Sequence, residues 1–75
     1  MQNYPLIDAE ATGKRIRQLR EENGLTVKEL EAKLHVTQRA IYRWEEGKSL
    51  PQIESLFAPS KLLGVSITEI LVQQD

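Results

Sequence analysis

Three short segments of the chain share one pattern: an apolar residue is followed directly by Thr or Ser, and a second apolar residue stands four positions after that hydroxyl residue. The hydroxyl residues are Thr26, Thr37 and Ser66. A hydroxyl in this position accepts a hydrogen bond from an unpaired amide in the first turn of a helix, and the two apolar residues form a hydrophobic staple. Glu29 and Glu69, three residues after a hydroxyl, complete two capping boxes. The pattern therefore marks three helix starts.

Glycines mark three helix ends. Gly24, Gly47 and Gly64 each follow a stretch with helical apolar spacing, where the residue after a helix often adopts a positive φ. Pro51 suits the first turn of a further helix. These signals predict an all-α domain without strands. Its five helices are expected over residues 8–23, 27–34, 38–46, 51–63 and 67–72.

The chain has 75 residues, which is enough for only one small domain. We expect this domain to span residues 8–72, with an N-terminal arm over 1–7 and a tail over 73–75, and we expect residues 1–6 and the tail to fray. No Cys is present and His35 is the single His, so disulfides are excluded and a zinc site is not expected.

Neither catalysis nor a membrane is indicated by the sequence. The chain has no cysteine nucleophile, no Gly-rich phosphate loop and no arguable Ser/His/acid set, so we expect neither an enzyme nor a cofactor. No apolar run reaches membrane-spanning length and residues 1–5 lack the features of a signal peptide, so a cytoplasmic protein is expected. No separate sensing domain fits in this length, so no small-molecule effector is expected.

The formal net charge of −1 argues against nucleic acid when taken alone. The charges are unevenly distributed, however. Residues 14–48 hold nine of the ten basic side chains and six acidic ones, a balance of +3, while each flank has a balance of −2. Such asymmetry is typical of a positive face, although a solvated helical surface would have the same composition.

The link between the second and third predicted helices contains only His35, Val36 and Thr37. So short a link forces a steep crossing, which is typical of a helix-turn-helix. Ile41 and Trp44 share the inward face of the third helix, where Trp44 is expected in the core. The opposite face of this helix carries groups that can read base edges, with Arg suited to guanine, Gln to adenine and an aromatic ring to the thymine methyl. These outward residues are Gln38, Arg39, Tyr42, Arg43 and Glu46.

Residues 15–26, 36–48 and 62–66 together resemble the phage-repressor-like helix-turn-helix proteins, the XRE or Cro-like family. The resemblance implies a compact five-helix, lambda-repressor-like domain with its helix-turn-helix at about 27–46. It further implies a bacterial or phage transcription regulator, with repression favoured, that binds a double-stranded DNA operator, usually as a homodimer, with helix 38–46 in the major groove.

The resemblance also assigns roles to individual residues. A partly buried ion pair is expected between Arg20 and Glu45. Backbone amides of residues 46–49 are expected at phosphate. Base-reading positions fall on Gln38, Arg39, Tyr42 and Arg43. Phosphate positions fall on Arg17, Thr26, Val27, Thr37, Lys48 and Ser49.

Four residues depart from the family pattern. Val27 replaces a frequent phosphate-contacting Gln, and Glu31 replaces a close-packed Ala, so Glu31 must splay the helices or bind a cation such as Arg39 or Arg43. His35 replaces the usual turn Gly and is expected at positive φ. Pro59 is expected to kink or break the fourth helix near Ala58.

These departures and the acidic flanks support an alternative function. The chain would then be an antitoxin or a protein-interaction adaptor with the same fold, a protein partner and weak DNA binding.

Overall fold

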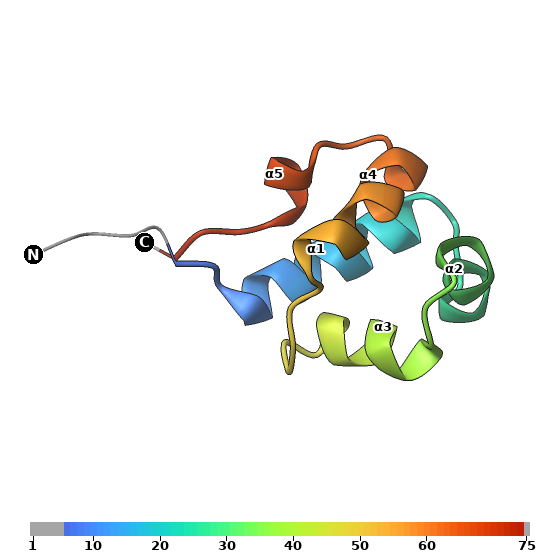
Figure 1. Ribbon diagram of the computed structural model, residues 1–75, viewed down its shortest axis with the longest axis horizontal. Helices are drawn as coiled ribbons and strands as arrows, with labels where there is room; N and C mark the ends of the chain where they lie inside the picture. Colours follow the sequence, from blue (N-terminus) through green and yellow to red (C-terminus); the bar gives the residue numbers. More distant parts are fainter. Residues whose placement is uncertain (1–5, 75) are drawn as a thin grey trace, which may run out of the picture.

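The computed structural model describes residues 6–74, and these form a helical domain (Figure 1). The all-α prediction is confirmed. Apart from one isolated antiparallel bridge, the described residues contain no strand. None of the helices within residues 6–74 has the length and apolarity needed to cross a membrane. The elements are α1 (Ala9–Glu22), α2 (Val27–Leu34), α3 (Gln38–Glu45), the 3₁₀ helix η1 (Ile53–Leu56), α4 (Phe57–Leu63) and α5 (Ile67–Ile70).

The three predicted helix starts are confirmed by side-chain caps. Thr26 Oγ1 accepts from the Glu29 amide at 3.0 Å, and Thr37 Oγ1 accepts from the Ala40 amide at 3.1 Å. Ser66 caps α5 in the same way, and both capping boxes are complete. The backbone amide of Thr26, followed by its hydroxyl, lowers the pKa of the Glu29 carboxyl. A negative charge is thus kept at the N-terminus of α2, where the helix dipole favours it.

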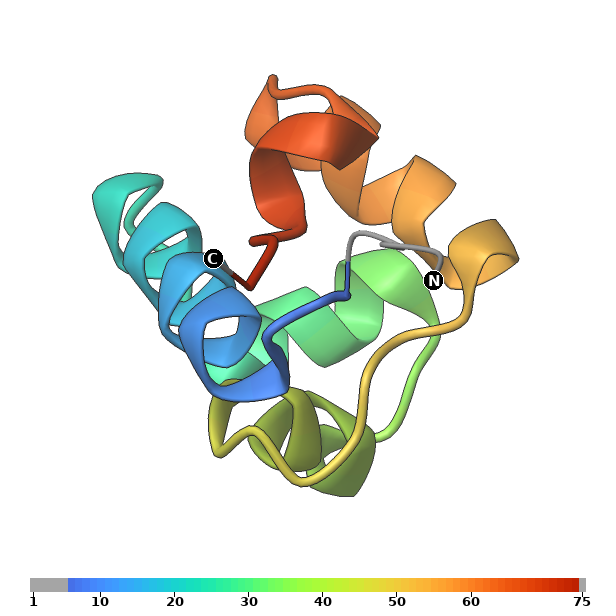
Figure 2. The ribbon, with the colours of Figure 1, turned by 90° about the vertical axis from the view of Figure 1, so that its left-hand side faces the viewer.

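The core lies among α1, α2, α3 and the C-terminal helices (Figure 2). Ile41 and Ile70 are fully buried, and Trp44 is 8% exposed, as its inward position predicted. Since the chain has no cysteine, packing of this cluster must supply most of the stability. The buried apolar residues are Ile16, Leu19, Val27, Leu30, Ile41, Trp44, Leu56, Leu63 and Ile70.

The predicted fourth helix over residues 51–63 is wrong in its first half. Residues 51 and 52 are not helical, a 3₁₀ turn covers Ile53–Leu56, and α4 begins at Phe57. The break therefore lies two residues before Pro59 and not at Ala58. Pro59 is buried in the first turn of α4, where its missing amide proton costs no intrahelical hydrogen bond.

The ends of the domain are tied together, contrary to the expected fraying of residue 6 and of the tail. The Asp8 amide donates to Val72 O and the Gln74 amide to Leu6 O, each at 2.7 Å. Thr12, 1% exposed, accepts from the Val72 amide at 2.9 Å. These bonds hold the C-terminal segment against the start of α1. Residues 1–5 of the expected arm, and residue 75 of the tail, lie outside the described residues.

Candidate nucleic-acid interface

The turn between α2 and α3 places the outer face of α3 at the surface. His35 has φ 57°, which confirms the positive φ expected where the family has Gly. Its amide donates to Glu31 O at 2.9 Å and ends α2, and Thr37 caps α3 two residues later. Because Ile41 and Trp44 are buried, the opposite side of α3 faces solvent.

Three of the four predicted base-reading side chains are exposed on this face: Arg39, Tyr42 and Arg43. Within residues 6–74, the guanidinium groups of Arg39 and Arg43 form no hydrogen bond or ion pair. Tyr42 is 51% exposed although its ring is largely apolar. The face thus presents two unpaired cations and one aromatic ring.

The fourth predicted base reader, Gln38, is half-buried and bonded within the protein. Its amide nitrogen donates to Glu31 Oε1 at 3.1 Å. Of the two outcomes expected for Glu31, a cation partner such as Arg39 or Arg43 is not found within residues 6–74. Gln38, in the first turn of α3, is close enough to donate to the Glu31 carboxylate, and both guanidinium groups have no partner among the described residues. The bond leaves the Gln38 carbonyl oxygen available as an acceptor.

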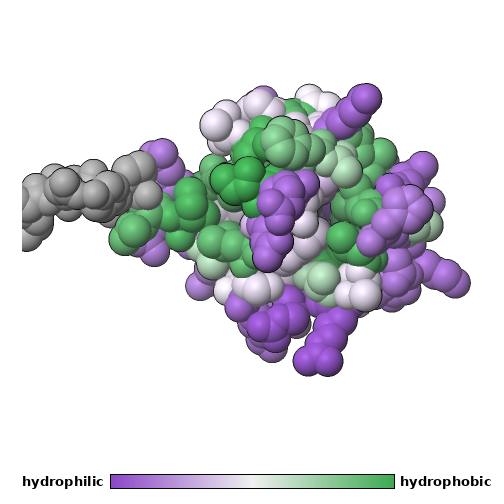
Figure 3. Space-filling model, in the orientation of Figure 1, coloured by the Kyte–Doolittle hydropathy of each residue, from purple (hydrophilic) through white to green (hydrophobic). Residues whose placement is uncertain are grey.

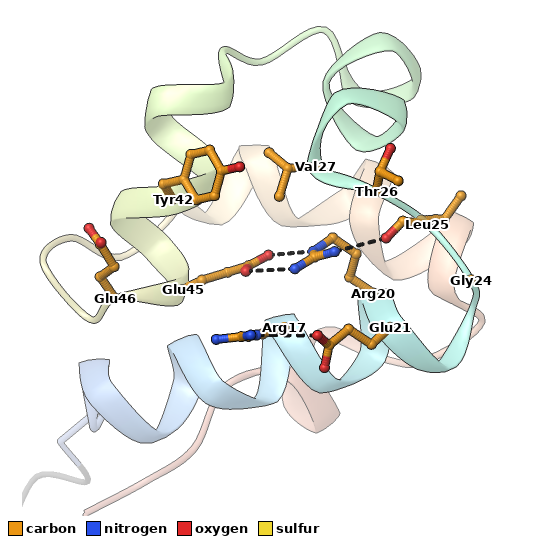
Figure 4. Close-up of a pocket in the computed structure, with 10 residues that line it drawn as sticks. All are labelled: Arg17, Arg20, Glu21, Gly24, Leu25, Thr26, Val27, Tyr42, Glu45 and Glu46. Carbon is orange, nitrogen blue, oxygen red and sulfur yellow. Dashed lines mark hydrogen bonds and ion pairs between the residues drawn. The ribbon is translucent and has the colours of Figure 1, made fainter.

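The predicted ion pair of Arg20 and Glu45 is present and nearly buried (Figure 4). Arg20 Nε and Nη2 donate to the two carboxylate oxygens at 2.7 and 3.0 Å, and Nη1 donates to Leu25 O at 2.9 Å. The side chains are only 11% and 7% exposed. The hydrogen bond to Glu45 raises the pKa of Arg20. The pair joins the C-terminal end of α3 to α1, and Arg20 also reaches Leu25 in the α1–α2 turn.

Two glycines that the sequence analysis did not connect with the site also position α3. A Cβ on Gly13, in the middle of α1, would lie 2.2 Å from Trp44 O and 2.8 Å from Glu45 O. A Cβ on Gly47 would lie 2.8 Å from the Cα of Glu10, and Gly47 has φ +74°. α1 and the end of α3 therefore approach at backbone distance. A glycine inside a helical pattern was the available signal for the first of these contacts.

The predicted phosphate-contacting side chains form a less uniform set. Thr26 and Thr37 are exposed but use their hydroxyls as helix caps, and Val27 is buried with 7% exposure. Arg17 lies 3.3 Å from Glu21, and Lys48 lies 3.5 Å from Glu46. These are exposed ion pairs, which contribute little to stability and are easily exchanged for a phosphate.

The backbone amides of residues 46–49 are not free, which corrects the expectation that they reach phosphate. The amides of Glu46 and Gly47 donate to carbonyls of α3. Those of Lys48 and Ser49 both donate to Arg43 O, at 2.9 and 3.4 Å. Only side chains of this segment remain as phosphate ligands, because closing the end of α3 uses its amide donors.

A groove of about 660 Å³ separates the C-terminal half of α1 from α3 (Figure 4). Two cations line it, Arg17 and Arg20, against three carboxylates, those of Glu21, Glu45 and Glu46. Both cations are paired with carboxylates. Among the described residues, the cations of this groove are therefore paired, whereas Arg39 and Arg43 on the outer face of α3 are not.

Residues 16–70 match the family model described as Helix-turn-helix. The chain belongs to this helix-turn-helix family. The matched region covers the buried core, the tight turn and all of α3. It also contains every predicted base-reading residue and both members of the Arg20–Glu45 pair.

Similar helix-turn-helix proteins include transcription regulators. The chain is 42% identical over 57 residues to the HTH-type transcriptional activator BcrR of Enterococcus faecalis. The match covers 76% of this chain and 28% of that relative, so the chain spans less than a third of the relative's length.

Two solved structures show the same fold at higher coverage. SinR, the master regulator for biofilm formation, solved in complex with DNA, has a TM-score of 0.73 and 32% identity over 79% of this chain and 95% of that chain. The clp gene regulator ClgR of C. glutamicum has a TM-score of 0.77 and 25% identity over 92% and 88%.

Proposed function

We propose that this helix-turn-helix domain binds double-stranded DNA with α3 in the major groove and that it regulates transcription from the operator so bound. The carrying observation is the exposed face of α3, where Arg39 and Arg43 have no partner within the described residues. Relatives named as a transcriptional activator and a DNA-bound regulator support the same function.

The mode of action follows from simple occupancy. A domain that covers an operator excludes polymerase without catalysis, so we propose a repressor that is not an enzyme and that acts in the cytoplasm. A reporter gene placed downstream of the selected operator tests whether the protein represses or activates transcription. Transcription that falls when the protein is expressed supports repression, and transcription that rises assigns activation.

The proposed base contacts follow from the side-chain chemistry. Arg39 and Arg43 can each donate two hydrogen bonds to guanine, and Tyr42 can pack on a thymine methyl. Gln38 is proposed to accept from adenine N6 or cytosine N4 through its free carbonyl oxygen. Arg17, Lys48, the exposed caps Thr26 and Thr37, Ser49 and the amide of Val27 are proposed to contact phosphate.

Selection from a pool of random duplexes at several salt concentrations tests this function. We expect enrichment of one sequence and an affinity that falls linearly with the logarithm of salt concentration. A pool that remains random, with an affinity independent of salt, would contradict DNA binding altogether.

Replacing Arg43 with Ala should weaken binding to the selected site by about 1–3 kcal/mol, roughly 5- to 150-fold, if Arg43 contacts one guanine in bidentate fashion. The loss should vanish when that base pair is changed. Titrating the wild-type protein and Arg43→Ala on the selected duplex and on the duplex with that base pair changed measures this, with Lys33→Ala on α2 as the control. Equal weakening on every sequence would assign Arg43 to phosphate instead.

Replacing Glu31 with Ala should change the base preference opposite Gln38. The substitution removes the acceptor that holds the Gln38 amide, so discrimination there should fall by about 0.5–1.5 kcal/mol, roughly 2- to 12-fold. A double-mutant cycle with Gln38→Ala measures the coupling. Additive effects of the two substitutions would show that Glu31 does not orient Gln38 on DNA.

A protein partner is the second candidate function, and the charge of the α1–α3 groove favours it. Its lining residues have a net charge of −1, and Arg17 and Lys48 are already paired with carboxylates. An antitoxin or adaptor with weak DNA binding would have this character. Copurification from the native host distinguishes the two functions, since a regulator of the first kind is recovered without a stoichiometric partner.

A further inference from the structure

The segment that follows α3, residues 46–49, contains one cation and one carboxylate. Lys48 Nζ lies 3.5 Å from Glu46 Oε1, and both side chains are more than half exposed. In Figure 3, which has the orientation of Figure 1, hydrophilic side chains gather along the lower edge of the domain, where α3 lies. Because Gly47 and Ser49 are uncharged, the two charges of this segment cancel.

The Glu46 carboxylate is not needed to hold the fold together. Within residues 6–74, its ion pair with Lys48 is its one polar interaction. Glu46 is the C-cap of α3, and there its backbone amide, not its side chain, donates to Tyr42 O at 2.9 Å. A negative charge at the C-terminal end of a helix is unfavourable, because it opposes the helix dipole. An uncharged side chain at this position is therefore expected to leave the domain folded.

Glu46 lies beside the groups that are proposed to contact phosphate. It lines the α1–α3 groove together with Arg17, Thr26 and Val27 (Figure 4). The amides that follow α3 bond to its carbonyls, so they cannot compensate for a carboxylate by donating to a phosphate. If Lys48 exchanges its exposed partner for a phosphate, the carboxylate remains nearby and repels that phosphate.

We propose that Glu46 limits the affinity of the domain for DNA by offsetting the attraction between Lys48 and phosphate. This inference rests on the proposed function, because it concerns a contact made only on DNA. Every duplex presents phosphates, so the carboxylate weakens binding to all sequences alike. Discrimination between bases is left to Arg39 and Arg43, which have no partner among the described residues. Glu46 thus sets how tightly the domain binds, and not which sequence it prefers.

Titration of the selected duplex and of an unrelated duplex between about 50 and 200 mM salt tests the proposal. Glu46→Gln keeps the size of the side chain and removes its charge. The affinity for both duplexes should rise by the same factor, about three- to tenfold at the lowest salt concentration. The logarithm of the affinity should also fall more steeply with the logarithm of salt concentration, by up to about one in slope, because the attraction of Lys48 is no longer offset.

Glu54→Gln is the matched control, because it makes the same change of charge at an exposed carboxylate of η1. In Figure 2, α3 lies at the bottom of the domain and η1 at its right-hand side. The affinity of Glu54→Gln for either duplex should therefore stay close to the wild-type value.

A second variant tests the balance between the two charges. Lys48→Ala alone should weaken binding to both duplexes, since it leaves the carboxylate without an opposing cation. Lys48→Ala combined with Glu46→Gln gives residues 46–49 no net charge, as in the wild-type protein. The affinity and the salt dependence of this double variant should therefore return close to the wild-type values.

Several results would overturn the proposal. If Glu46→Gln binds no better than Glu54→Gln while the wild-type protein still selects one sequence, the inference fails and DNA binding stands. A gain confined to the selected duplex would make residue 46 a base-contacting position. A double variant that keeps the whole gain would show that Glu46 does not offset Lys48. A wild-type protein that binds neither duplex would contradict both this inference and the proposed function. Circular dichroism confirms that each variant is folded.

Discussion

Arg20→Met is expected to destabilise the domain by about 3–5 kcal/mol, because the carboxylate of Glu45 would stay nearly buried with no cation beside it. The same change removes the donor to Leu25 O. The free energy of unfolding of a small domain is only about 5–15 kcal/mol, so this one substitution removes a large share of the stability. Urea unfolding followed by the fluorescence of Trp44 measures the loss.

Arg17→Met provides the matched control. Arg17 lies on the same helix and also pairs with a carboxylate, that of Glu21 at 3.3 Å, but both of these side chains are more than half exposed. The loss of an exposed pair is expected to cost less than about 1 kcal/mol. If the two variants unfold at the same urea concentration, the Arg20–Glu45 pair does not behave as a buried one.

A double variant separates the value of the pair from the penalty of leaving one charge alone. Arg20→Met combined with Glu45→Met should recover most of the stability lost in the single variant, because apolar side chains can replace a buried ion pair at little net cost. Such a recovery would mean that the two substitutions are energetically coupled and that the ion pair has a structural role. It also predicts that the double variant keeps α3 in place and retains DNA binding.

The features that were predictable from the sequence are governed by neighbouring residues. The caps at Thr26, Thr37 and Ser66 depend on atoms within four residues, and the structure has all three. The positive φ of His35 is also present, but it was predicted from the resemblance, because His35 stands where the family has Gly. The Arg20–Glu45 pair spans a longer distance, and it was predicted only through the resemblance to a family.

The errors concern choices between competing partners. Glu31 has three candidate partners on α3, namely Gln38, Arg39 and Arg43. Their positions relative to Glu31 decide that Gln38, and not an arginine, donates a hydrogen bond to its carboxylate. Residues 46–49 have amides that can bond either to DNA or to the end of α3, and helix closure uses them. The tie between Thr12 and Val72 joins residues 60 positions apart, which no local pattern reveals.

The start of α4 shows a different limit. Pro51 and Pro59 are both compatible with the first turn of a helix, and the predicted helix over residues 51–63 begins at the earlier one. In the structure the later proline occupies that position, in the first turn of α4, while Pro51 is buried in the non-helical segment before η1. Both prolines are buried, so the local signals do not decide between them.

Gly13→Ala is expected to destabilise the domain by about 3 kcal/mol, although Ala is the better helix former by about 1 kcal/mol. The two effects have opposite signs, so the outcome identifies which one dominates. The new Cβ would lie 2.2 Å from Trp44 O, and a backbone carbonyl at a helix end cannot rotate away as a side chain would. α1 and α3 would have to separate, and urea unfolding measures the loss.

Gly24→Ala is the control for this substitution, since a Cβ there meets nothing within 4 Å and only the positive φ of +68° opposes it. That strain is expected to cost about 1–2 kcal/mol. Gly13→Ala should also weaken binding to the selected duplex beyond its loss of folded protein, because a displaced end of α3 carries Arg43 with it, whereas Gly24→Ala should not. A Gly13→Ala variant more stable than wild type would mean that α1 and α3 do not approach at backbone distance.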